Sequence, residues 1–99
     1  MDDDLIKSPM EFEWDSGNLD KSSKKHGIFP SESEEIFFNN PLLINGDASH
    51  SQAEVRYMAL GKTNEEKLLF VIFTIRRNKI RIISARNMNK KERGIYEEV

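Results

Sequence analysis

The sequence predicts a single α+β domain in which a short N-terminal strand and two helices precede an antiparallel meander sheet and a C-terminal helix. Three observations predict this class. Residues 11–14 alternate acidic and aromatic side chains, residues 68–75 are apolar on both faces, and capping residues precede three other segments. The 99 residues allow one domain with one modest core. We assign residues 10–99 to this domain and expect the acidic residues 1–9 to form a disordered leader.

The N-terminal strand and first helix are predicted from residues 11–27. In a strand over residues 11–14, Phe12 and Trp14 fall on the same face. Polar residues at 15–18 can cap a helix that ends near His26, and Gly27 suits the left-handed position after it.

A second helix is predicted after Pro30. Ser31 and Glu34 have the spacing of a capping box, in which each side chain binds a backbone amide of the first turn. The helix should run to about residue 39, bury Ile36 and Phe37, and end before the proline at position 41.

The rest of the chain should complete the sheet and add the last helix. We expect strands at residues 42–44, 55–61, 68–75 and 80–86. The third of these is apolar on both faces, so it should lie at the centre of the sheet. Asn78 should take a positive φ in the turn before the last strand. Asn89 can cap a helix over residues 90–98, whose apolar side chains are Ile95 and Tyr96.

Composition excludes several classes of function. The absence of cysteine excludes disulfides and thiolate chemistry, and no segment approaches the roughly 20 apolar residues of a membrane span. The two histidines are far apart in sequence and the five glycines are scattered, so metal-ligand spacings and phosphate-binding loops are both missing. We therefore expect a soluble cytoplasmic protein without a cofactor.

Charge is distributed unevenly along the chain. The formal net charge is −2, yet residues 76–93 hold eight basic side chains and a single acid, Glu92. A cationic surface carried by a rigid sheet suits a polyanion, and RNA is the candidate. The alternative is that these side chains are solvated rims and gatekeepers beside an aggregation-prone strand.

An ordered set of short motifs spans about residues 10–98. It comprises Phe12-Glu13-Trp14-Asp15, Lys25-His26-Gly27, Phe29, Glu34-Glu35, Asn40-Pro41-Leu42, Asp47, His50-Ser51, Glu54, Arg56, Gly61, Thr74, Arg76 or Arg77, Arg81-Ile82-Ile83-Ser84-Ala85-Arg86, Glu92-Arg93 and Tyr96. In this order the motifs resemble those of BrnT-type toxins. The acidic residues before Met10 depart from the family pattern, which leaves the start site open and makes Met10 a candidate alternative start.

The resemblance implies a RelE-like fold and a ribonuclease toxin of a bacterial type II toxin–antitoxin pair, which cleaves mRNA and inhibits translation. It also implies a BrnA-type antitoxin with a ribbon-helix-helix DNA-binding part, and a complex that represses its own operon. In this scheme the toxin reaches operator DNA only through the antitoxin, and toxin and antitoxin form a heterotetramer.

Cleavage of RNA without a metal uses the 2′-hydroxyl as nucleophile. It requires a proton acceptor, a proton donor for the leaving 5′-oxygen, and cations beside the phosphorane. Arginine supplies only the cation, because it stays protonated. We assign Glu54, Arg56, Arg86 and His26 to catalysis and Lys25, Arg76, Arg77, Arg81 and Tyr96 to RNA binding.

Each arginine assignment has an alternative. Glu54 and Arg56 project from the same face of a strand, where they serve as proton acceptor and phosphate clamp or form a plain ion pair. Arg81 and Arg86 are five residues apart, so an unbroken strand puts them on opposite faces and only a bulge brings them together. Arg86, at the strand end, is the preferred transition-state arginine, and Arg76 can join it only if the hairpin register allows.

The proton carriers also have structural alternatives. His26 is either catalytic or a helix-end residue packed over Trp14, and His50 is either functional or an ordinary turn residue. Tyr96 either contacts RNA or anchors the last helix to the sheet. Because well-placed proton carriers are scarce, a non-catalytic module that binds a partner protein or RNA through its basic face is the competing function.

Overall fold

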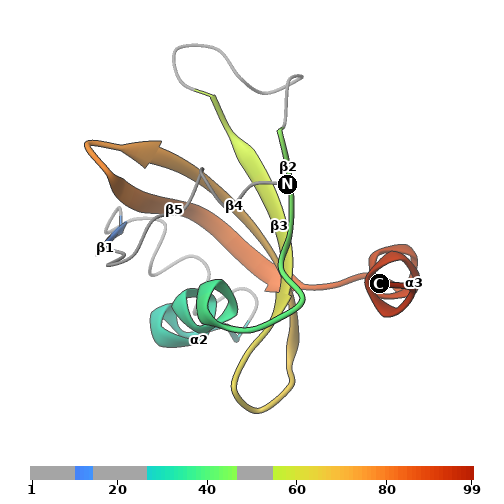
Figure 1. The fold of residues 1–99 in the computed structure, drawn as a ribbon. Coiled ribbons are helices and arrows are strands. Elements are labelled where there is room, and N and C mark those ends of the chain that lie inside the picture. The colour runs from blue at the N-terminus through green and yellow to red at the C-terminus, as the bar shows by residue number, and fades with distance from the viewer. Residues whose placement is uncertain (1–10, 15–26, 47–54) are drawn as a thin grey trace.

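The computed structural model describes residues 11–14, 27–46 and 55–99. Within them lie β1 (Glu11–Trp14), α2 (Pro30–Glu35), the 3-10 helix η2 (Ile36–Phe38), β2 (Leu43–Gly46), β3 (Tyr57–Lys62), β4 (Leu68–Arg76), β5 (Lys79–Asn87) and α3 (Lys90–Glu97). The strands form a five-stranded sheet in the order β1-β5-β4-β3-β2, with β2 to β5 antiparallel and β1 parallel to β5 (Figure 1). The predicted mixed α+β class and the antiparallel meander are confirmed. No helix in these described segments is long and apolar enough to cross a membrane.

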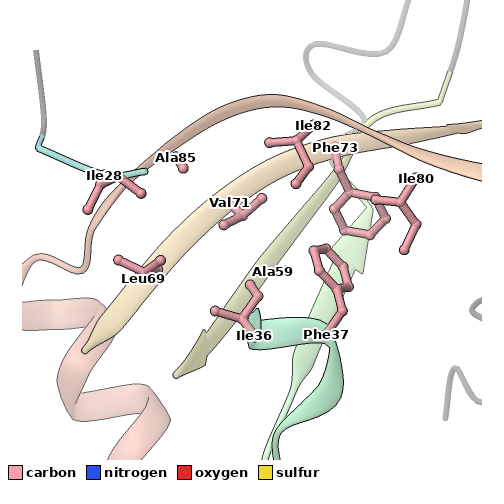
Figure 2. Packing of buried hydrophobic residues seen from close by; sticks show 10 residues of the cluster. All are labelled: Ile28, Ile36, Phe37, Ala59, Leu69, Val71, Phe73, Ile80, Ile82 and Ala85. Atoms are coloured by element: carbon pink, nitrogen blue, oxygen red, sulfur yellow. The ribbon is translucent and has the colours of Figure 1, made fainter. Parts of the chain in front are cut away.

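The core lies between one face of the sheet and the segment that carries α2 and η2. Leu69, Val71 and Phe73 of β4 are fully buried on this face, and Ile36 and Phe37 cover them from η2 (Figure 2). The rings of Phe37 and Phe73 meet edge to face with centroids 5.1 Å apart. The central position predicted for residues 68–75 is confirmed, because β4 has two strands on either side.

The turn between β4 and β5 has positive φ at two residues. Arg77 has a φ of 53° and Asn78 a φ of 65°, as a two-residue type I′ hairpin turn requires. The positive φ predicted for Asn78 is confirmed, and so is the left-handed Gly27, with a φ of 68°. The first helix predicted before Gly27 lies outside the described residues, as does the leader.

The start of α2 differs from the prediction. Phe29, and not Ser31, is the N-cap residue, and Pro30 occupies the first helical position. There its missing N–H costs no hydrogen bond. The carboxylate of Glu32 accepts from the backbone N–H of Phe29 at 2.9 Å, so the Ser31 and Glu34 capping box was wrong by two residues. The helix also ends at Glu35 and continues only as η2.

The observed strand boundaries differ from the predicted ones by one or two residues. The strand predicted at residues 42–44 is observed as Leu43–Gly46, and that predicted at 55–61 as Tyr57–Lys62. The last strand and helix match closely, with Asn89 confirmed as the N-cap of α3. The strand β1 packs Phe12 and Trp14, both partly buried, against the core, so Glu11 and Glu13 face away from it.

Candidate nucleic-acid interface

A β-bulge in β5 brings Arg81 and Arg86 to the same side of the sheet. Phe73 pairs with Ile82 and Ile72 pairs with Ser84, which leaves Ile83 as an extra residue. Beyond this bulge the alternation along β5 is reversed, so both arginines face away from the core. We call this side the outer face; it also carries Met58 and Leu60 of β3 and Phe70 and Ile72 of β4, all partly buried.

Arg86 is held between an aromatic ring and a carboxylate. Its guanidinium carbon lies 4.0 Å from the centroid of the Phe70 ring, a cation–π arrangement. Its Nη1 and Nη2 donate to Oε1 and Oε2 of Glu92 at 2.8 and 2.9 Å, and Nη1 also donates to the Asn87 carbonyl at 3.1 Å. The hydrogen bond from Arg86 lowers the pKa of the Glu92 carboxyl below its ordinary value, although burial opposes the shift. Glu92 is therefore ionised at neutral pH.

The sequence around Asn89 explains why Glu92 reaches Arg86. The Asn89 side chain accepts from the Glu92 N–H at 2.8 Å, and the Glu92 carboxylate accepts from the Asn89 N–H at 2.9 Å. This capping box fixes the first turn of α3. It begins two residues after β5 ends, so the carboxylate of the first turn is brought back beside the strand end.

Arg81 lies at the other end of the outer face. It pairs with Thr74 across the hairpin, whereas Arg86 pairs with Phe70, so the two arginines are separated by about 13 Å along the strand direction. Arg81 also forms an ion pair of 3.3 Å with Glu13 of β1.

Arg56 directly precedes β3, next to the position of Arg81 in the sheet. The Thr74 hydroxyl donates to the Val55 carbonyl at 2.7 Å, which holds the residues just before β3 against β4. The pleat then places Arg56 on the outer face with Met58. Two strand spacings, about 10 Å, separate its backbone from that of Arg81.

The remaining arginines lie at the hairpin turn. Arg76 pairs with Lys79, and Arg77 is a turn residue; both arginines are exposed. Arg76 lies six positions along β4 from Phe70, the partner of Arg86, which amounts to about 20 Å. The register therefore does not allow Arg76 to join Arg86 at one phosphate.

Tyr96 anchors α3. Its ring is 5% exposed, and its hydroxyl donates to the Pro41 carbonyl at 2.6 Å. Burial raises the pKa of this phenol. The geometry favours the helix-anchor alternative over RNA contact.

Several predicted site residues are not placed. Glu54, His26, Lys25 and His50 lie outside the described residues, so their relation to Arg86 stays a prediction. Among the residues that the structure describes, no group of three or more His, Cys, Asp or Glu side chains could hold a metal ion.

Sequence reasoning also missed three residues: Glu92, Phe70 and Glu13. The spacing of Asn89 and Glu92 was a usable signal for Glu92, since a capping-box acid in a basic run has cations within reach. The contacts of Phe70 with Arg86 and of Glu13 with Arg81 depend on the pairing register of the strands, which no local sequence pattern predicts.

The outer face can bind an extended polyanion. It has cations at both ends, with apolar side chains between them, and Arg86 offers a rigidly held guanidinium at a strand end. Arginine stabilises negative charge but moves no proton at neutral pH, so proton transfer needs another group.

Comparisons with known proteins agree with this architecture. No curated protein sequence matches the chain. The crystal structure of the Brucella abortus ribonuclease toxin BrnT aligns with a TM-score of 0.61 and 23% identity, covering 82% of this chain and 99% of the toxin. At that identity the match supports the fold. A family model described as "Ribonuclease toxin, BrnT, of type II toxin-antitoxin system" matches residues 14–92. The chain therefore belongs to the BrnT family of ribonuclease toxins of type II toxin–antitoxin systems.

Proposed function

We propose that the chain is an endoribonuclease of RelE-like type that cleaves mRNA without a metal in the chemical step and so inhibits translation. The observation that supports this most is the position of Arg86. Its guanidinium is held on the outer face at a strand end, on the same side of the sheet as Arg81. A fixed cation at this place suits the negative charge that develops on a phosphorane.

The reaction is a transfer of the phosphoryl group within the RNA. Glu54 takes the proton of the 2′-hydroxyl, the 2′-oxygen bonds to phosphorus, and the bond to the 5′-oxygen breaks. His26, protonated, gives its proton to that leaving oxygen. Arg86 stabilises the intermediate charge. The products are a 2′,3′-cyclic phosphate and a 5′-hydroxyl end.

RNA binding is assigned to the other cations. The backbones of Arg56 and Arg81 are about 10 Å apart, and their side chains contact phosphates upstream or downstream of the cleaved one. Arg76 and Arg77, at the hairpin turn, extend the electrostatic attraction beyond this central region, and Lys25 is proposed to add a further positive charge. Phe70 is covered by Arg86, so the partly buried Ile72 gives bases an apolar surface between the phosphate contacts.

The proposed partner is a BrnA-type antitoxin. It neutralises the toxin by covering the outer face or by binding its cations with an acidic segment. Its ribbon-helix-helix part carries operator DNA binding, and toxin and antitoxin assemble as a heterotetramer. A co-crystal whose interface avoids residues 76–86 would contradict this mode of neutralisation.

The test compares the wild-type protein with Arg86→Ala on a short RNA in EDTA. We expect the wild type to leave cyclic phosphate ends, and Arg86→Ala to reduce the rate about 100- to 1000-fold with its fold intact. Lys91→Ala is the control, because Lys91 is an exposed cation of the same basic run. Equal rates for Arg86→Ala and the control would refute the role of Arg86.

A non-catalytic binding module is the second candidate function. One observation favours it: Glu92, the titratable group bound to Arg86, is held ionised by its lowered pKa and is a poor proton donor. Intact RNA after prolonged incubation with the wild type, together with tight binding, would support the module and refute the enzyme.

A further inference from the structure

The single acid of the basic run forms a bidentate ion pair on the outer face. Both carboxylate oxygens of Glu92 accept from Arg86, at 2.8 and 2.9 Å. The Glu92 side chain is 16% exposed and that of Arg86 is 35% exposed, so the pair is partly shielded from water. A bidentate pair of this kind fixes the plane of the guanidinium as well as its position.

Three of the five N–H groups of Arg86 are occupied. Two go to Glu92, and the second N–H of Nη1 goes to the Asn87 carbonyl at 3.1 Å. The N–H of Nε and the remaining N–H of Nη2 lie together on one side edge of the guanidinium. Within the described residues neither has an acceptor. This edge has the geometry that binds two oxygens of one phosphate.

The Glu92 side chain is also held by the backbone at the N-cap of α3. The same carboxylate accepts from the Asn89 N–H at 2.9 Å as part of the capping box of α3. Rotating the carboxylate away from Arg86 would therefore also open the first turn of the helix. On its other side, Arg86 rests on the Phe70 ring at 4.0 Å.

We propose that Glu92 is a positioning residue, which holds the Arg86 guanidinium so that its Nε–Nη2 edge is left for the phosphate of bound RNA. This inference rests on the ribonuclease function proposed above. An acid beside a catalytic cation has an opposite possible role, in which it competes with RNA for Arg86 and slows the enzyme. The two roles predict opposite changes when the charge of Glu92 is removed.

Two substitutions separate the ion pair from the helix cap. Glu92→Gln keeps an oxygen for the Asn89 N–H, because glutamine also serves at this position of a capping box, but it removes the charge and one acceptor from Arg86. Asn89→Ala removes the side-chain cap of the Glu92 N–H, but the backbone N–H of residue 89 remains to donate to the Glu92 carboxylate. If Glu92 positions Arg86, only the first should affect catalysis strongly.

The kinetic test measures kcat and KM for wild type, Glu92→Gln, Asn89→Ala, Arg86→Ala and the double variant of residues 86 and 92. We expect Glu92→Gln to lower kcat roughly 10- to 100-fold with a smaller change in KM, since misplacing a catalytic group acts mainly on the chemical step. We expect Asn89→Ala to keep its kcat, and Glu92→Gln to add no further loss in the Arg86→Ala background.

Three outcomes would overturn the proposal. A rise in kcat for Glu92→Gln would make Glu92 a competitor of RNA. An equal loss in both backgrounds would mean that Glu92 acts independently of Arg86. An equal loss in Asn89→Ala would assign the effect to the integrity of α3.

A nuclear magnetic resonance measurement keeps the inference separate from the proposed function. Bidentate pairing slows rotation of the guanidinium, so the Nη protons of Arg86 should give distinct signals in the wild type and in Asn89→Ala, and averaged signals in Glu92→Gln. Distinct signals in Glu92→Gln would refute positioning even if RNA is cleaved. Failure of the wild type to cleave RNA would refute the proposed function, and the spectra would still decide whether Glu92 orients Arg86.

Discussion

Arg81 and Arg86 lie on the same face of β5 although they are five residues apart, because Ile83 forms a bulge between them. In a regular strand the two side chains would point to opposite faces, so the sequence predicted that only one of these arginines could contact the reacting phosphate. With the bulge they belong to one surface, about 13 Å apart along the strand. That separation exceeds the span of one phosphate group, so we expect the two arginines to contact different phosphates of one RNA strand.

Arg81→Ala should weaken RNA binding and reduce its salt dependence. Each phosphate contact to single-stranded nucleic acid contributes about 0.7 to the slope of log K against log salt, so losing Arg81 should lower the slope by about that amount. A non-cleavable 2′-O-methyl RNA measured over a salt series checks this. Lys67→Ala is the control, because Lys67 binds Glu32 of α2 at 3.4 Å. An equal change in slope for both variants would contradict a specific contact at Arg81.

The sequence predicted features that depend on neighbouring residues. The two-sided apolar run placed β4 at the centre, Asn78 indicated the turn, and Asn89 marked the start of α3. Each of these follows from the conformational preference of a short segment.

Features that depend on distant pairing were not predicted. The parallel pairing of β1 with β5 brings Glu13 to Arg81 from 68 residues away. The Ile83 bulge likewise results from the pairing register of β4 and β5, and no residue type in the strand predicts it. The candidate site was therefore predicted as a set of residue types, whereas their grouping on one face required the fold.

Tyr96→Phe should lower stability and leave RNA cleavage unchanged. The substitution removes the 2.6 Å hydrogen bond to the Pro41 carbonyl, which should cost about 1 kcal/mol of unfolding free energy. The ring itself remains and keeps α3 docked. Urea denaturation and kcat, measured on the same preparation, test this. A large fall in kcat with unchanged stability would restore Tyr96 as an RNA-contacting residue.

The ion pair of Glu92 should make stability depend on pH in acid. The pKa of Glu92 is lowered in the folded protein from its ordinary value of 4.5, so the folded state binds this proton less readily than the unfolded state. The stabilisation is then fully present above pH 4.5 and is lost as pH falls through the folded pKa. The difference in unfolding free energy between wild type and Glu92→Gln should be constant near neutrality and shrink below pH 4.5. A difference that stays constant through this acid range would contradict the lowered pKa.

Two glycine-to-alanine substitutions should have opposite effects on stability. At Gly61 an added Cβ would lie 2.8 Å from the Cβ of Ile36, so β3 and η2 would have to separate. Overpacking of this kind typically costs about 1 to 3 kcal/mol. At Gly94, inside α3, an added Cβ meets no atom within 4 Å, and alanine should stabilise the helix by about 0.5 to 1 kcal/mol.

Urea midpoints of the Gly61→Ala and Gly94→Ala variants, compared with wild type, check both signs. Gly61 packs against η2, and Gly94 is on the exposed side of α3. The first variant therefore tests core packing, and the second tests the helix propensity of alanine against glycine. A neutral Gly61→Ala would mean that η2 can move away from β3 at little cost. The close packing of Ile36 against Gly61 would then contribute little to the stability of the core.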